Sequence, residues 1–268
     1  MRKRVPEAAR PCVLVFAGLD PSGGAGIGAN IEAIAAQGAH PLAIVTALTV
    51  QDNNRVHEVA PVAADLLERQ AALLAAGMPI RAVKIGIPGN RANAEAIARI
   101  VVALRTRRPG LPVVLDPVLA SGHGDALARG DAPASLAPLL ALASVITPNL
   151  PEAAALGLLA ADATDRPLAG TAALADWQHL LVTGGHGDGD EVVNRWLGGG
   201  SVREWRWPRL PGAFHGSGCT LASSLAARLA LGEAMAQALE NAQRYCNQTL
   251  ADSYAIAPGQ RIPRRIAH

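Results

Sequence analysis

The stretch Leu210-Pro211-Gly212-Ala213-Phe214-His215-Gly216-Ser217-Gly218-Cys219-Thr220 runs directly into an alanine-rich segment, Leu221 to Leu231. A glycine-rich loop followed at once by a helix-forming run predicts free backbone N–H groups that converge at a helix N-terminus, where the macrodipole adds about half a positive charge. Gly216 and Gly218 let the main chain approach an anion closely. Cys219 falls on the first turn, where we expect the pKa of a thiol to be lowered. The segment predicts an anion site, and a glycine-capped helix with a buried cysteine remains the alternative.

On both sides of this loop, short apolar runs alternate with longer segments of helical period. This order predicts buried parallel strands with helices on both faces, a sheet type that binds ligands at the carboxyl ends of its strands. Two further segments, Glu191 to Leu197 and Ser201 to Trp207, are separated by three glycines and predict an antiparallel hairpin near an edge of the sheet. The expected strands are Val13–Ala17, Leu42–Leu48, Ala82–Ile85, Pro112–Leu115, Ser144–Ile146 and His179–Val182, and the expected helices are Gly28–Gln37, Ala63–Ala76, Asn93–Arg107 and Leu221–Ala230.

Length and composition limit the kind of protein. A chain of 268 residues with 50% hydrophobic content can bury one large core, so we expect a single domain over residues 1–268. It would carry a basic N-terminal extension, residues 1–11, and a poorly ordered C-terminal tail, about residues 259–268. The net charge is only +2, and the basic residues are scattered among acidic ones. This distribution does not favour nucleic acid as a partner. No apolar run is long enough to span a membrane, and three cysteines form no disulfide framework, so we expect a cytoplasmic protein.

A second glycine-rich turn follows the first expected strand. Its Gly24, Gly26 and Ala29 match the dinucleotide-binding pattern G-x-G-x-x-A. We reject a nicotinamide enzyme because Asp20-Pro21-Ser22 separates these glycines from the strand, and because no acidic residue ends the second strand to hold a ribose. A Walker A loop, which ends in Gly-Lys-Ser/Thr, is also missing. A nucleotide enzyme built on this chain would be of another design.

Carboxylates follow two of the expected strands. Asp116 ends one strand, and Asn149 and Glu152 lie just beyond another. Hard oxygen ligands of this kind suit Mg²⁺, which is held by one or two carboxylates together with substrate phosphates. Taken singly, Asp116 also fits a turn, and Glu152 a helix start stabilised by the dipole. His186 lies in a glycine turn after a further strand, where a lone histidine is more often a loop residue than a catalyst.

Several segments, in order along the chain, resemble the hydroxymethylpyrimidine/phosphomethylpyrimidine kinases of thiamine biosynthesis. They are Asp20–Ile27, Thr46–Leu48 with Gln51, Lys84–Gly86, Asp116–Val118, Thr147–Glu152, Gly184–His186 and His215–Thr220. The resemblance spans about Val13 to Leu229 and implies a ribokinase-like three-layer α/β/α sandwich, ATP with Mg²⁺, and a homodimer. It also implies phosphorylation of 4-amino-5-hydroxymethyl-2-methylpyrimidine and then of its monophosphate.

The resemblance assigns expected roles by motif. The catalytic anion hole would consist of Gly216, Gly218 and Cys219, where Cys219 replaces the aspartate base of many ribokinase relatives. The pyrimidine would contact Gly18, Asp20, Asn30, Thr49, Gln51 and Ile87; ATP would contact Asn149, Thr183, Gly185, His186 and Ser217; and Mg²⁺ would lie at Asp116 and Glu152. Gln51 offers both a donor and an acceptor, which suits an aminopyrimidine edge.

Three departures from the family pattern keep other functions open. One is the loop from Ser121 to Asp125, which lacks a lysine that the family often has there. Asn30 stands where the family usually has aspartate, and Thr183 stands where it often has lysine. One alternative is a pyridoxal or pyridoxine kinase of the same fold. The other is a non-catalytic pyrimidine- or nucleotide-binding protein on a degenerate kinase scaffold, although the anion-hole loop argues against a pure binder. We expect the polar segment Thr49 to Val59 to close over the site.

Overall fold

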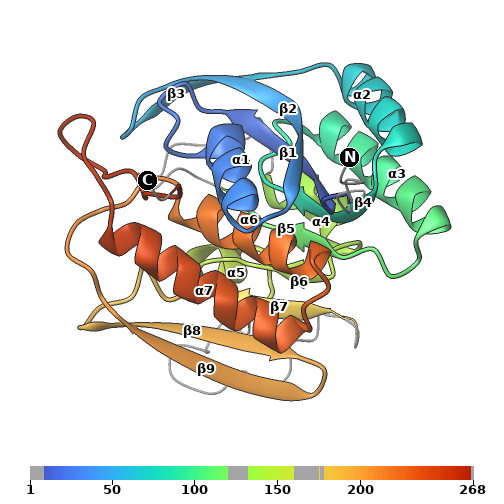
Figure 1. Ribbon diagram of the computed structural model, residues 1–268. Helices are drawn as coiled ribbons and strands as arrows, with labels where there is room; N and C mark the ends of the chain where they lie inside the picture. The colour runs from blue at the N-terminus through green and yellow to red at the C-terminus, as the bar shows by residue number, and fades with distance from the viewer. Residues whose placement is uncertain (1–8, 120–131, 160–174, 176–177, 267–268) are drawn as a thin grey trace, which may run out of the picture.

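The computed structural model describes residues 9–119, 132–159, 175 and 178–266 (Figure 1). Within them, the strands form one sheet in the order β3-β2-β1-β4-β5-β6-β7-β8-β9. The strands are β1 (Cys12–Leu19), β2 (His40–Gln51), β3 (Val56–Pro61), β4 (Ile80–Ile85), β5 (Val113–Leu115), β6 (Val145–Ile146), β7 (His179–Val182), β8 (Glu191–Gly198) and β9 (Ser201–Pro208). The helices are α1 (Gly26–Ala36), α2 (Ala64–Gly77), α3 (Arg91–Arg107), α4 (Ala132–Leu140), α5 (Leu150–Ala155), α6 (Ser217–Ala230) and α7 (Met235–Ala251).

Strand β1 lies inside the sheet, between β2 and β4, and is buried on both faces. Its side chains alternate between two cores: Leu14 and Phe16 join one, and Val13 and Val15 join the other. A continuous apolar run is what a parallel strand covered on both faces requires. Apolar character along the whole strand therefore places β1 in the interior of a three-layer structure.

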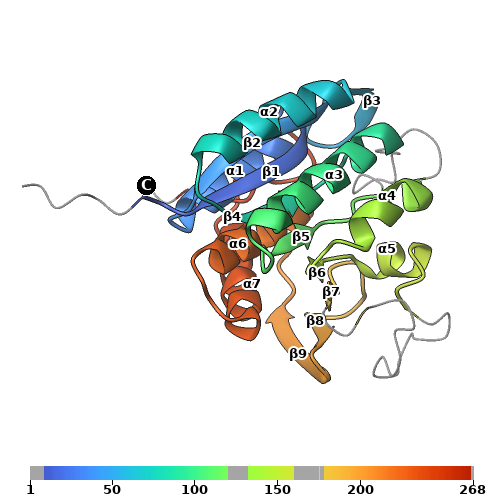
Figure 2. The ribbon, with the colours of Figure 1, turned by 90° about the vertical axis from the view of Figure 1, so that its right-hand side faces the viewer.

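Helices cover both faces of the sheet, as Figure 2 shows. Buried residues of α2, α3, α4 and α5 pack in the core that contains Phe16, whereas those of α1, α6 and α7 pack in the core that contains Val15. The predicted three-layer α/β/α sandwich is thus confirmed. Helices α4, α5 and α7 were not among the expected helices. The buried side of α7 includes the polar Gln243 and Thr249.

The sheet is parallel from β2 to β7 and antiparallel at both edges. The predicted hairpin is present: β8 pairs antiparallel with β7 and with β9. At the other edge, β2 continues to Gln51 and β3 turns back along it, with Thr49 opposite Val59. The segment expected to close over the site is therefore an edge β-hairpin that begins in one of the parallel strands.

The C-terminal segment is packed against the protein, so the expected disorder of residues 259–268 is wrong for residues 259–266. Gln260, Ile262 and Arg265 are buried. The Asn53 and Asn54 side chains, at the tip of the β2–β3 hairpin, donate to main-chain oxygens at Pro258 and Gln260. Isolated bridges pair Phe214 with Arg261 and Tyr254 with Ile262. The basic composition of residues 259–266 suggested disorder, but main-chain hydrogen bonds hold this segment against the protein. Most of the basic N-terminal extension, residues 1–8, lies outside the described residues.

No helix in the described ranges combines the length and apolar character that a membrane crossing requires.

Replacement of Ile262 by alanine should destabilise the protein by about 2–5 kcal/mol, because its side chain is buried and truncation leaves a cavity. Ile256→Ala is a matched control from the same segment, since Ile256 is 51% exposed and Ile262 is 2% exposed. The control should change stability by less than about 0.5 kcal/mol. Urea unfolding of both variants measures this difference, and equal, negligible effects would show that the segment is not packed.

Candidate active site

The candidate site lies at the carboxyl ends of the parallel strands. Asp20 follows β1, Asp116 follows β5, Asn149 lies shortly after β6, and Thr183 follows β7. Because these strands run in parallel, their carboxyl ends meet at one edge of the sheet. The N-terminus of α6 lies at the same edge, since Gly218 is close to Asp116: a Cβ on Gly218 would be 3.6 Å from an Asp116 carboxylate oxygen.

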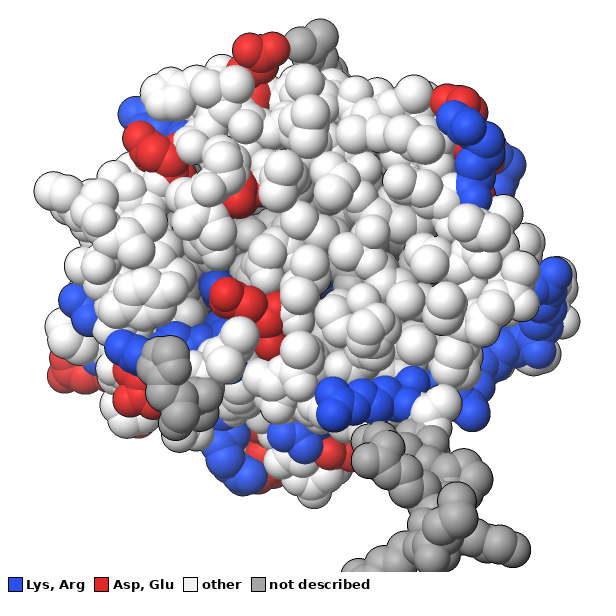
Figure 3. Space-filling view, turned by 45° about the horizontal axis from the view of Figure 1, so that its top comes forward, with Lys and Arg blue, Asp and Glu red and all other residues white. Residues whose placement is uncertain are grey.

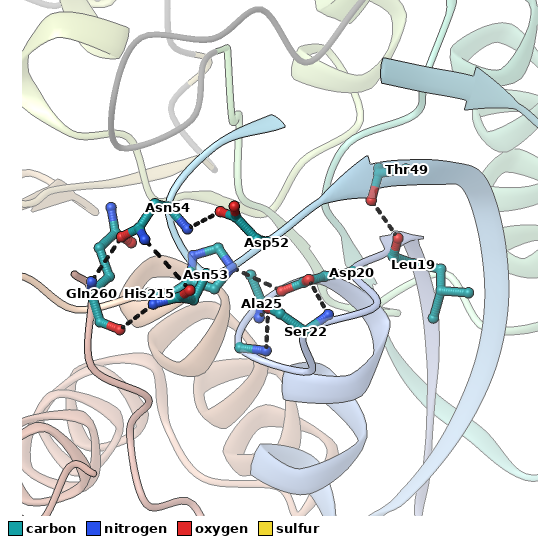
Figure 4. A network of polar contacts seen from close by, with 12 residues as sticks. Leu19, Asp20, Ser22, Ala25, Thr49, Asp52, Asn53, Asn54, His215 and Gln260 are labelled. Atoms are coloured by element: carbon teal, nitrogen blue, oxygen red, sulfur yellow. Dashed lines mark hydrogen bonds and ion pairs between the residues drawn. The ribbon is translucent and has the colours of Figure 1, made fainter. Parts of the chain in front are cut away.

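Asp20 organises the glycine loop after β1. Its carboxylate accepts hydrogen bonds from the backbone N–H groups of Ser22 (2.8 Å) and Ala25 (2.7 Å). The same carboxylate contacts His215 Nε2 at 2.8 Å, as Figure 4 shows. Burial opposes ionisation of Asp20, but hydrogen bonds from His215, Gln51, Ser22 and Ala25 hold the pKa of this carboxyl well below its usual range. Asp20 is therefore a fixed anion that ties this loop to the loop before α6.

The two glycine-rich loops are in direct backbone contact. Gly216 is the N-cap of α6 and has φ of 72°, and a Cβ there would lie 2.1 Å from the Gly24 carbonyl oxygen. A Cβ on Gly24 would in turn lie 2.2 Å from His215. Helix α6 has no side-chain N-cap, so the N–H groups of its first turn find no capping acceptor. This geometry leaves a helix N-terminus suited to an anion, as the sequence predicts.

A buried ion pair lies beside this helix end. Lys84 Nζ is 3.3 Å from Asp116 Oδ2, and both side chains are removed from water. Burying two charges is costly unless they compensate each other. Asp116 thus belongs to a charged cluster inside the site, and its negative charge is partly balanced before any ligand binds.

Cys219 lies on the first turn of α6, but its thiol does not have the expected low pKa. Burial raises the pKa of Cys219 above its usual value, while the positive charges of Lys84 and Arg265 oppose that shift. Removal of the thiol from water outweighs the helix dipole and the nearby cations. The expectation of a lowered pKa is therefore wrong, and the thiol is protonated near neutral pH.

Asn149 and Glu152 form a capping box at α5. The Asn149 side chain accepts from the Glu152 N–H at 2.8 Å, and the Glu152 carboxylate accepts from the Asn149 N–H at 2.9 Å. Burial raises the pKa of Glu152 to about 7; the hydrogen bond from Asn149 opposes this shift, and the negative charge of Asp116 adds to it. The two carboxylates are thus close enough to repel each other.

Of the residues expected at the pyrimidine, all except Asn30 lie near the ends of β1, β2 and β4. A Cβ on Gly18 would lie 2.6 Å from Ile87, so these two residues are in contact. The Thr49 hydroxyl donates to the Leu19 carbonyl at 2.7 Å, and Gln51 hydrogen bonds to Asp20.

Asn30 lies beneath α6 and is fully buried. Its Oδ1 accepts from the Ser223 hydroxyl at 2.9 Å. Its Nδ2 is buried and has no hydrogen-bond partner in the described part of the chain. Asn30 is thus separated from the exposed part of the site, one helical turn beyond Cys219 along α6.

Among the residues expected at ATP, Ser217 begins α6, and Asn149 and Thr183 lie together. The Thr183 N–H donates to the Pro148 carbonyl at 2.9 Å, and Thr183 forms a bridge with Asn149. Gly185 and His186 are exposed in the loop after β7, where the Gly185 carbonyl accepts from Arg209. These residues extend from the helix end along the β6–β7 edge.

Sequence reasoning assigned no role to three residues that build the site: His215, Lys84 and Arg265. Lys84 had a detectable signal, because it is one of only two lysines and stands in an apolar strand. Arg265 had none, because it lies in a segment rich in arginine and proline.

Comparison of the sequence with known proteins identifies a family. A sequence model of the phosphomethylpyrimidine kinase family matches residues 20–263. A hydroxymethylpyrimidine/phosphomethylpyrimidine kinase of Rhizobium meliloti is 35% identical over 257 residues, which cover 92% of this chain and 93% of the relative. A thiamine biosynthesis multifunctional protein of Corynebacterium efficiens is 36% identical over 258 residues, and the match covers 94% of this chain but only 34% of that longer protein.

The structure resembles a solved pyridoxal kinase of Bacillus subtilis in its ADP complex. The TM-score is 0.82 at 25% identity, over 96% of this chain and 98% of that one. This likeness confirms the ribokinase-like fold. Since the family pattern covers residues 20–263 and includes both glycine loops, the chain belongs to the phosphomethylpyrimidine kinase family.

Proposed function

We propose that the protein transfers phosphate from ATP to 4-amino-5-hydroxymethyl-2-methylpyrimidine, to its monophosphate, or to both, in thiamine biosynthesis. The observation that carries the proposal is the uncapped N-terminus of α6 beside two carboxylates at the carboxyl edge of the sheet. Phosphoryl transfer needs mainly positioning and charge stabilisation, and this edge offers both. Family membership and the kinase names of the relatives support the same reaction.

The transferred phosphoryl group would bind the first turn of α6. The N–H groups of Ser217, Gly218 and Cys219 begin this turn, and Gly216 gives it the left-handed N-cap that lets the loop pack on Gly24. Donors aimed at developing negative charge in a water-poor site stabilise the transition state. We assign Gly216, Gly218 and Cys219 to catalysis on this basis.

The donor set at Asp116 and Glu152 fits Mg²⁺. Magnesium is usually held by one or two carboxylates and takes its further oxygens from phosphates and water. The raised pKa of Glu152 reflects burial near another carboxylate, a repulsion that a divalent cation would relieve. When bound, Mg²⁺ would neutralise the phosphate oxygens.

The acceptor would lie on the other side of the α6 N-terminus, among Gly18, Thr49, Gln51 and Ile87. Gln51 is held by Asp20, which leaves an amide able to pair with an aminopyrimidine edge. The adenine nucleotide would extend along Asn149 and Thr183 toward Gly185 and His186. Asn30 is buried under α6, so we assign it to the support of this pocket.

We also propose a homodimer that works in the cytoplasm, where ATP is available. Leu48 and Val50 on β2 are 51% and 56% exposed, and Figure 3 shows a wide area without charged side chains on the face that includes the β2–β3 side of the molecule. Exposed apolar area of this kind is typical of a contact surface. Sedimentation of the purified protein should give twice the chain mass, and Leu48→Asp should reduce it to one chain mass.

The first test is ADP release from Mg²⁺-ATP with four acceptors in parallel: the hydroxymethylpyrimidine, its monophosphate, pyridoxine and pyridoxal. Turnover with the pyrimidines supports the proposal. Turnover with the pyridines alone would favour the pyridoxal kinase function, which the likeness to the Bacillus subtilis enzyme keeps as second candidate. Absence of turnover with all four would support a binding protein.

Cys219→Ser should lower kcat for the hydroxymethylpyrimidine by about 10²-fold, and kcat for its monophosphate much less. An alcohol must lose a proton during transfer, whereas a phosphate acceptor is already anionic. Because burial raises the thiol pKa, wild-type activity on the alcohol should increase as pH rises toward that pKa. Initial rates with both acceptors from about pH 6 to 10 measure this, with Cys12→Ser as the control for a thiol outside the site. Equal losses on both acceptors would remove the base role.

Glu152→Gln should abolish a pH-dependent effect of Mg²⁺ on stability. The pKa of Glu152 is raised to about 7, so the stability it contributes is fully present below its unfolded-state pKa and is lost as pH rises through about 7. Mg²⁺ would bind the ionised form and restore stability above about pH 7. At ten times its Kd, a ligand contributes about 1.4 kcal/mol, or roughly 3 °C in Tm.

Thermal unfolding with and without Mg²⁺ at about pH 6 and about pH 8, on either side of that pKa, measures this effect. A glutamine at this position can keep the capping box, so Glu152→Gln should fold. Glu68→Gln, on α2, is the matched control and should retain the wild-type response. An unchanged Mg²⁺ response in Glu152→Gln would remove Glu152 from the cation site.

A further inference from the structure

The C-terminal segment inserts one guanidinium behind both glycine loops. The Arg265 side chain is completely buried, although the segment that carries it is rich in charge and begins beyond the last helix. Main-chain hydrogen bonds fix this segment: Arg261 accepts from the His215 N–H at 2.9 Å and donates to the Ala213 carbonyl at 2.8 Å. The Arg265 carbonyl accepts from the Tyr245 hydroxyl at 2.7 Å. The position of the guanidinium is therefore fixed from both its backbone and its side chain.

Each nitrogen of Arg265 contacts a different element. Nε donates to the Thr220 hydroxyl in the first turn of α6 at 2.8 Å, and Nη2 donates to the Gly24 carbonyl in the loop after β1. Nη1 lies 3.2 Å from a carboxylate oxygen of Glu32 on α1. The planar fork of arginine can satisfy three such acceptors in one fixed geometry, which lysine cannot.

The contacts lead to the backbone of the candidate anion hole. The Thr220 hydroxyl, which accepts from Arg265, donates to the Gly216 carbonyl at 2.8 Å. A Cβ on Gly216 would lie 3.0 Å from Arg265 Nη2, so the guanidinium is packed directly behind the N-cap. Burying a charge is costly, and the ion partner Glu32 is 40% exposed. A less costly apolar side chain could fill the space but could not join the two loops.

We propose that Arg265 is a positioning residue for phosphoryl transfer: it fixes the α6 N-terminus against the Gly24 loop and adds positive charge behind the bound phosphoryl group. The inference rests on the proposed kinase function. Arg265 need not touch the substrate, because it acts through Thr220 and the Gly24 carbonyl.

The test compares Arg265→Met, Arg265→Lys and Arg264→Met. Arg264 is the matched control: it is exposed in the same segment and stacks on Tyr254. Arg265→Met should lower kcat by about 10²-fold, because misplaced donors lose transition-state stabilisation, while KM for the acceptor changes little. Arg265→Lys keeps the charge without the fork and should restore only part of kcat. Arg264→Met should stay within about twofold of wild type. Equal kcat in Arg265→Met and Arg264→Met would overturn the proposal.

A second readout does not depend on the identity of the acceptor. Inorganic phosphate bound at the α6 N-terminus should protect Cys219 from iodoacetamide at alkaline pH, where part of the thiol is ionised despite its raised pKa and unliganded wild type is alkylated. Peptide mass spectrometry locates the modified cysteine. Arg265→Met should weaken this protection by about tenfold, the worth of a hydrogen bond to a charged group. If wild type fails with all four acceptors but shows phosphate protection that Arg265→Met loses, the kinase proposal fails and the role of Arg265 at the anion site stands. Equal protection in wild type and Arg265→Met would overturn that role.

Thr220→Val covers the case in which Arg265→Met does not fold. It removes the hydroxyl between Arg265 and Gly216 and leaves the guanidinium in place. It should lower kcat by about tenfold and weaken phosphate protection in the same direction. Thermal unfolding of each variant identifies any loss of fold, and a folded Thr220→Val with wild-type kcat and phosphate protection would also overturn the proposal.

Discussion

The close contact between two glycine loops is the constraint on which the rest of the site depends. Gly216 packs against the Gly24 carbonyl so tightly that neither position has room for a side chain. Two loops without side chains at their contact have little apolar surface to hold them together, so polar interactions between the loops must stabilise the contact. One such interaction joins Asp20 to His215, and in the other Arg265 donates to the Gly24 carbonyl. Backbone N–H groups can serve as a fixed anion hole only when the loops that carry them are held in this way.

Among the described residues, the buried charged side chains lie at the candidate site, and the rest of the core is uncharged. Lys84 and Asp116 form a buried pair, and Glu152 lies near enough to have its pKa raised. Such arrangements are expensive in a stable core, but they are useful where a ligand with several negative charges and a cation must be bound and released. A carboxyl group with a raised pKa and a buried ion pair at one sheet edge are therefore more informative about function than any single motif.

The sequence predicted the features that come from periodicity and glycine placement. The apolar runs of β1 and β4 and the alanine-rich α6 were recognisable, and the loop from His215 to Thr220 marked the helix end. The sequence could not show contacts between distant segments. Arg265 carries no local signal, and the raised pKa of Cys219 depends on burial by residues far away in the chain. Helix α7 was missed because many of its residues are polar, although its buried positions recur with helical spacing. The C-terminal segment was misjudged because its basic composition was taken as a sign of disorder.

The link between Gly24 and Arg265 joins residues that are 241 positions apart. All described strands of the sheet and the first turn of α6 precede Arg265 in the chain. The ribosome therefore synthesises both glycine loops before it synthesises Arg265. Domains begin to fold while synthesis continues. The nascent protein can possess its sheet and both loops and still lack the contact between Arg265 and Gly24. On the proposed role of Arg265, the anion site would be complete only after the C-terminal segment has been synthesised and packed.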